Sequence, residues 1–227
     1  MARRRRRPSF GHDTTPGTAP PKARRRDRDL LPDPVSTRTQ QALTRPRIII
    51  CGTGRAGTSA LVRLLTRLGL DTGYTPAAEN FSPQIKAGCE HTASGFRHAA
   101  TWKNLPRIVK SPELSFHLGE LPVPIEHVLI PVRNLDAAAT SRKRNRLPWK
   151  KRRMSQRDSI AAALGEAIAA CIPNEIPCSL LAFPRHVTDP DYTFAILAAV
   201  FPEIADRRDH FDAAFAEVNP PATPPPE

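Results

Sequence analysis

The chain has 227 residues, a hydrophobic content of 40% and a formal net charge of +12. This length fits one ordinary globular domain and leaves little room for a second. No apolar run approaches the roughly 20 residues that a membrane-spanning helix needs, so we expect no membrane span.

The positive charge is concentrated in two stretches. Residues 1–45 carry twelve Lys and Arg against four Asp, and residues 142–157 carry nine Lys and Arg and no acid. The rest of the chain is mildly acidic. Because the first stretch is rich in Arg and Pro and has no apolar periodicity, we predict a disordered basic tail over 1–45. A folded domain over 46–218 and a Pro-rich disordered tail over 219–227 complete the predicted organisation.

The four cysteines show no zinc-type spacing. Cys51, Cys89, Cys171 and Cys178 form no C-x-x-C pair, and no apolar signal-peptide core follows Arg3–Arg7. We therefore expect a cytoplasmic protein with free thiols, and Cys51 as a buried residue at the end of a strand.

The predicted elements alternate between strands and helices. Ile48–Cys51 is an apolar, β-branched run of the kind found in buried parallel strands. From Thr58 the leucines recur at spacings of three and four, which predicts a helix that Gly69 closes. Residues 72–101 have weak periodicity and are predicted as a long loop with at most one helix.

The second half of the chain continues this alternation. A helix is predicted to start near Asn134 or Asp136, and another has Pro190 at its first position. The predicted fold class is α/β, a three-layer α/β/α P-loop-type parallel sheet. The expected elements are strands at 107–110, 127–132 and 179–183 and helices at 135–144, 157–171 and 190–201.

The segment after the first strand has the spacing of a phosphate-binding loop. Gly52 and Gly57 fit G-x-x-x-x-G between a strand and a helix, where backbone N–H groups and the helix dipole favour an anion. Ser59 occupies the Ser/Thr position of the Walker A motif, but Thr58 replaces its lysine. A triphosphate would lose its main cation, so the loop favours a shorter phosphate chain, with Arg55 as its cation. The alternative is an ordinary turn whose glycines only permit tight packing.

A second candidate anion site follows the strand at 127–132. Arg133 lies at the carboxyl edge where open α/β sheets bind ligands, and Ser141 lies about two helical turns further on. An arginine and a hydroxyl on the same side make a compact anion site. The alternative is a solvated arginine and a serine on the helix surface.

Three segments together resemble the sulfotransferase family, especially its bacterial members and the tyrosylprotein sulfotransferases. They are 51–65 (CGTGRAGTSALVRLL), 107–112 (RIVKSP) and 128–141 (VLIPVRNLDAAATS), within a resemblance that spans roughly 48–200. It implies a sulfuryl transfer from 3′-phosphoadenosine 5′-phosphosulfate (PAPS) to a hydroxyl or amine, without a metal. Lys110 and Arg55 would act on the sulfuryl group, and Arg133 and Ser141 would hold the 3′-phosphate. The loop residues that would hold the 5′-phosphosulfate are Gly52, Gly54, Arg55, Ala56, Gly57, Thr58 and Ser59.

The chain also departs from the family pattern. Ala56 replaces the usual loop serine, Leu135 replaces a proline, and Pro112 stands where cytosolic sulfotransferases carry a catalytic histidine. The base is therefore expected to be a carboxylate, either Glu90, which follows a G-x-x-E-like pattern, or Glu79.

Two other classes of protein share some of these features. A kinase or NTPase would need the Walker lysine and a Mg²⁺-binding acid after the strand at 127–132, where this chain has Arg133. A nucleic-acid-binding module would use the basic stretches and stack a base on Trp149, although no recognised nucleic-acid motif is present. In the sulfotransferase interpretation, the stretch 142–157 lies on the acceptor side and points to an anionic acceptor.

Overall fold

The computed structural model describes residues 43–76, 95–145 and 154–220. The predicted tails lie almost wholly outside these ranges. Outside them also lie two candidate bases, one cysteine and the tryptophan of the basic stretch: Glu79, Glu90, Cys89 and Trp149.

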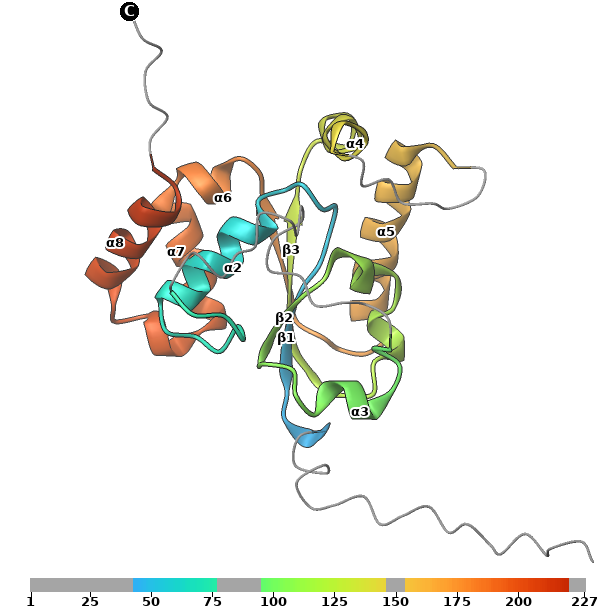
Figure 1. Ribbon diagram of the computed structural model, residues 1–227, viewed down its shortest axis with the longest axis horizontal. Coiled ribbons are helices and arrows are strands. Elements are labelled where there is room, and N and C mark those ends of the chain that lie inside the picture. Colours follow the sequence, from blue (N-terminus) through green and yellow to red (C-terminus); the bar gives the residue numbers. More distant parts are fainter. Residues whose placement is uncertain (1–42, 77–94, 146–153, 221–227) are drawn as a thin grey trace, which may run out of the picture. The chain divides into compact units, whose positions relative to one another are not determined.

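The core element is a four-stranded parallel sheet in the order β2-β1-β3-β4. Because all strands run the same way, their carboxyl ends meet at one edge of the sheet, the upper edge in Figure 1. The prediction of an α/β protein with a parallel sheet is confirmed. The strands are β1 (Arg47–Ile50), β2 (Ile108–Lys110), β3 (Ile125–Val132) and β4 (Cys178–Ala182).

Helices cover both faces of the sheet (Figure 1). Ile48 and Ile50 of β1 pack into one apolar cluster with residues of α2, α7 and α8, whereas Ile49 and Cys51 pack into a second cluster on the opposite face. This second cluster includes α5 and the short α3. Burial on both faces explains why β1 is a continuous apolar run instead of an alternating one. The helices named here are α2 (Thr58–Arg67), α3 (Ala99–Trp102), α5 (Gln156–Cys171), α7 (Pro190–Val200) and α8 (Arg208–Val218).

The predicted helices are present with the expected caps. α2 buries Leu61, Leu64 and Leu65, and Gly69, which follows its C-cap residue Leu68, has a φ of 82°. α4 (Leu135–Arg144) begins at Asn134, whose side chain accepts a hydrogen bond from the N–H of Ala137. Asp189 caps α7 in the same way. Side-chain caps satisfy N–H groups that the first turn of a helix leaves open.

Two helices near the C-terminus were not predicted. α6 (Arg185–Thr188) is a single turn after β4, and α8 is amphipathic, with Phe211 and Phe215 buried against the first cluster. Short 3₁₀ turns connect the other elements at 112–116, 118–120 and 202–204. Among the described residues, no helix is long and apolar enough to cross a membrane.

Candidate functional site

The loop between β1 and α2 is strongly curved. Four of its residues have positive φ angles: Gly52 (107°), Gly54 (61°), Arg55 (56°) and Gly57 (76°). The Gly52 N–H donates a hydrogen bond to Ser115 Oγ (2.8 Å), which fixes the start of the loop to the 3₁₀ turn after β2. Successive backbone turns of this kind present their N–H groups to a common anion.

Position 52 requires glycine for two reasons, its positive φ angle and its close approach to β3. A Cβ atom at this position would lie 2.7 Å from the carbonyl oxygen of Pro131 in β3, which cannot move without shifting the strand. We therefore expect Gly52→Ala to lower the free energy of unfolding by roughly 3 to 5 kcal/mol, measured by urea denaturation.

Gly69→Ala is the matched control for this substitution. Gly69 also has a positive φ (82°), but a Cβ there would meet nothing within 4 Å, so the expected loss is only about 1 kcal/mol. Equal losses in the two variants would contradict the close approach of the loop to β3.

The loop ends at a helix N-terminus with no side-chain cap. Gly57 is the N-cap residue of α2 and, since it has no side chain, gives the helix no side-chain cap. Thr53 is fully buried, and its Oγ1 has no hydrogen-bond partner among the described residues. Open N–H groups and an unsatisfied buried hydroxyl are the features expected of a site that receives an anion.

The two predicted anion sites adjoin each other. Arg133 Nη1 donates a hydrogen bond to the carbonyl oxygen of Arg55 (3.1 Å), and Arg55 Nε donates to Ser141 Oγ (3.3 Å). The guanidinium of Arg133 also lies over the ring of Phe183, 4.8 Å from its centroid. In the described part of the chain, neither Arg55 nor Arg133 forms an ion pair with a carboxylate. Among the described residues, therefore, both guanidinium groups lie at the junction of the loop and α4 without a carboxylate counter-ion.

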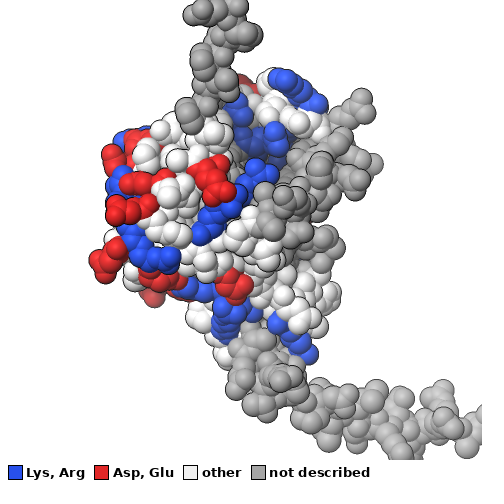
Figure 2. Space-filling view, turned by 60° about the vertical axis from the view of Figure 1, so that its left-hand side comes forward, with Lys and Arg blue, Asp and Glu red and all other residues white. Residues whose placement is uncertain are grey.

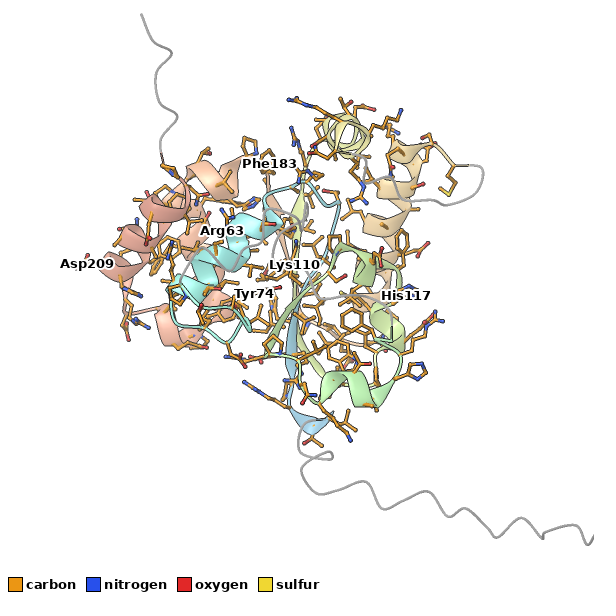
Figure 3. All side chains as sticks on the ribbon, in the orientation of Figure 1. Arg63, Tyr74, Lys110, His117, Phe183 and Asp209 are labelled. Carbon is orange, nitrogen blue, oxygen red and sulfur yellow. The ribbon has the colours of Figure 1, made fainter. Side chains whose placement is uncertain are left out.

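Lys110 brings a cation to the loop from the neighbouring strand. It is the last residue of β2, lies beside Ile50 of β1, and is only 1% exposed. Its Nζ lies 3.5 Å from Ser59 Oγ in the first turn of α2. Figure 3 shows Lys110 in the interior beside α2. A buried lysine at the carboxyl edge of the sheet is unusual, because burying a charge costs free energy unless the charge is paired or hydrogen-bonded.

Arg142 is a fourth cation of the site and was missed by the sequence analysis. The basic stretch 142–157 was treated as one segment, but Arg142 lies in α4 and is only 7% exposed, whereas Lys143 and Arg144 are exposed. A Cβ atom on Gly54 would lie 2.5 Å from Arg142 Nη1, so the guanidinium lies against the loop. Helical periodicity could have indicated that Arg142 is buried, because it follows the buried residues Ala138 and Ala139 by four and three positions and so lies on the same face of α4.

A cleft of about 420 Å³ opens beside Arg133 on the α5 side of the sheet. Arg157 and Asp136 line it and form an ion pair of 3.2 Å, both largely exposed. Arg133 is therefore shared between the cleft and the loop. The other lining residues are Val132, Asn134, Leu135, Leu164 and Ala182.

The surface charge matches this arrangement. In Figure 2, basic side chains gather at the upper end of the visible face, the end that carries the carboxyl edge of the sheet, and acidic side chains lie mainly over the left side. Several acids of α7 and α8 have arginine partners, including Asp191 and Asp212, which both pair with Arg208. In the described ranges, no group of three or more His, Cys, Asp or Glu side chains could hold a metal ion.

The structure thus brings most of the predicted site residues together at one edge. The loop residues 52–59, Lys110, Arg133 and Ser141 all lie there, while the candidate bases Glu79 and Glu90 fall outside the described residues. Cys51 is fully buried directly after β1, as predicted, and burial raises the pKa of its thiol to about 12.

A scan against models of known protein families and a search among curated proteins found no match to this chain.

Proposed function

We propose that the chain transfers a sulfuryl group from PAPS to a hydroxyl or amine acceptor. The observation that carries the proposal is the junction of two anion sites, in which Arg133 contacts the loop at Arg55 and Arg55 contacts Ser141. A donor that carries a phosphosulfate on the 5′ carbon and a phosphate on the 3′ carbon of the same ribose needs two such sites side by side. The resemblance of the three segments to sulfotransferases supports the same assignment.

The residues present suit this donor better than a nucleoside triphosphate. Thr58 stands where a triphosphate-binding loop has its lysine, and the residue after β3 is Arg133 in place of a Mg²⁺-binding acid. The 5′-phosphosulfate would lie in the loop at the uncapped N-terminus of α2. The 3′-phosphate would be held by Arg133 and Ser141.

The chemistry requires positioning and charge stabilisation. The acceptor oxygen or nitrogen attacks the sulfur atom, the bond between sulfur and the bridging oxygen of the donor breaks, and adenosine 3′,5′-bisphosphate leaves. The cations Arg55 and Lys110 would stabilise the negative charge that develops on the sulfuryl and leaving-group oxygens. The proton of the acceptor passes to a base, for which Glu90 and Glu79 are the proposed carboxylates.

A transfer assay tests this function directly. The protein is incubated with ³⁵S-labelled PAPS and a panel of hydroxyl and amine acceptors that includes anionic ones. We expect labelled product and adenosine 3′,5′-bisphosphate to form in equal amounts. Glu90→Gln or Glu79→Gln should slow turnover without weakening the binding of the bisphosphate. If neither variant slows turnover, the base is a different group.

A further inference from the structure

His186 is buried between the end of β4 and the loop that joins β1 to α2. It lies in α6 and is only 2% exposed. Its Nδ1 is 3.2 Å from the carbonyl oxygen of Ala182. Because a carbonyl only accepts hydrogen bonds, Nδ1 carries the proton, and Nε2 of the neutral ring is an acceptor. Nε2 is buried and has no hydrogen-bond partner among the described residues.

This unpartnered nitrogen faces the loop. A Cβ atom on Gly57 would lie 2.6 Å from Nε2 and 3.0 Å from Cε1 of the imidazole. Gly57 is the N-cap residue of α2, the helix whose first turn has no side-chain cap. An open helix N-terminus and a buried acceptor without a donor therefore meet at the same loop residue.

Burial favours the neutral ring of His186 in the free protein. It lowers the pKa of the imidazole below the usual 6.5, and this effect outweighs the opposite effect of the backbone carbonyls of Ala182 and Gly57. The ring contacts Phe183 edge-on (centroids 5.9 Å apart), and Arg133 lies over that same phenyl ring.

The acids on the elements packed against His186 form ion pairs with arginines. Asp189 pairs with Arg185 of α6, and Asp191 of α7 pairs with Arg208. The first turn of α2 contains no acid. None of these described elements therefore offers His186 an unpaired acid that would favour a positive charge on the imidazole.

We propose that His186 takes up a proton from solvent when an anionic group occupies the loop, and thereby links anion binding to pH. A phosphate or sulfate bound beside Gly57 supplies the negative charge that the free site lacks, and the protonated Nε2 becomes a donor instead of an unsatisfied acceptor. By linkage, the affinity for an anion is highest at low pH and falls as pH rises through the pKa of His186 in the complex. The inference rests on the proposed function only in that the loop binds an anion.

A nuclear magnetic resonance titration of the imidazole tests the proposal in the unmodified protein. The pKa of His186 is measured alone, with saturating sulfate and with saturating adenosine 3′,5′-bisphosphate. We expect both anions to raise it. Sulfate stays fully ionised across this pH range, so its result reports on the protein alone. If either anion binds and leaves the pKa of His186 unchanged, the proposal is overturned.

A variant gives an independent readout. His186→Asn keeps a donor for the Ala182 carbonyl but cannot titrate. We expect the sulfate affinity of the wild type to fall several-fold between about pH 5 and 8 and that of His186→Asn to stay nearly flat. His127→Asn is the matched control, because burial also lowers the pKa of His127, whereas its Nε2 already has a partner in Ser179 Oγ (2.9 Å). If the sulfate affinity of His186→Asn depends on pH as strongly as that of the wild type, the proposal is overturned.

The outcomes also separate this proposal from the sulfotransferase assignment. If sulfate raises the pKa of His186 but adenosine 3′,5′-bisphosphate does not bind, the donor assignment fails and the role of His186 stands. If the bisphosphate binds without changing the pKa of His186, the donor assignment survives and the role of His186 fails. If neither anion binds, both fail.

Discussion

Arg133→Ala is expected to lower the affinity for adenosine 3′,5′-bisphosphate by about 2 to 3 kcal/mol, on the order of 100-fold. The guanidinium of Arg133 lies at the junction of the loop and Ser141 and has no carboxylate partner among the described residues. The 3′-phosphate would be its counter-ion, so removal of the guanidinium removes a charge-assisted hydrogen bond. Isothermal titration calorimetry at constant salt measures the change.

Two comparisons make this result specific. Adenosine 5′-monophosphate lacks the 3′-phosphate, so Arg133→Ala should change its affinity by only a few-fold. Arg157→Ala removes a different arginine of the same cleft, one that is paired with Asp136, and should leave the bisphosphate affinity within a few-fold of the wild type. Equal losses for the monophosphate and the bisphosphate in Arg133→Ala would mean that Arg133 does not hold the 3′-phosphate.

Arg142→Ala is expected to weaken binding of the same bisphosphate by about 1.5 to 2 kcal/mol, roughly 10- to 30-fold. The guanidinium of Arg142 lies against Gly54, where it would contact a bound 5′-phosphate. Since Arg142 is buried, the variant also loses packing, and we expect its melting temperature to fall by several degrees. Binding is therefore measured well below the melting temperature of the variant.

Arg144→Ala is the control for Arg142. Both arginines belong to α4, but the side chain of Arg144 is exposed, so its removal changes the overall charge equally without touching the loop. We expect Arg144→Ala to bind the bisphosphate as the wild type does, apart from a small effect that salt screens. If the two variants lose affinity to the same extent, Arg142 acts through long-range charge and not through contact with the loop.

The sequence predicts the sheet and the loop because their signals are local. β1 must be apolar on both faces to lie in the centre of a parallel sheet, and the glycines of the loop must follow it directly. The helix starts at 58, 135 and 190 were predicted from leucine spacing, Asn134 and Pro190, and all three were confirmed. Spacing along the chain also suggested that Arg133 and Ser141 face the same side, and both lie at the loop.

The features that the sequence did not predict depend on contacts between distant segments. α8 was not predicted, and its Phe211 and Phe215 pack into the cluster that also contains residues of α2 and α7. Arg142 was grouped with exposed neighbours because charge runs are usually solvated. His186 gave no local signal at all: only the position of α6 against Gly57 shows that its Nε2 faces the loop.

Ligand preference of the wild-type protein tests the central claim most directly. Calorimetric titrations with adenosine 3′,5′-bisphosphate, ATP with Mg²⁺ and a DNA oligomer are compared at the same ionic strength. The account predicts that the bisphosphate binds most tightly, and that Arg133→Ala abolishes this preference. Tighter binding of ATP with Mg²⁺, or DNA binding that is indifferent to Arg55→Ala and Arg133→Ala, would contradict it.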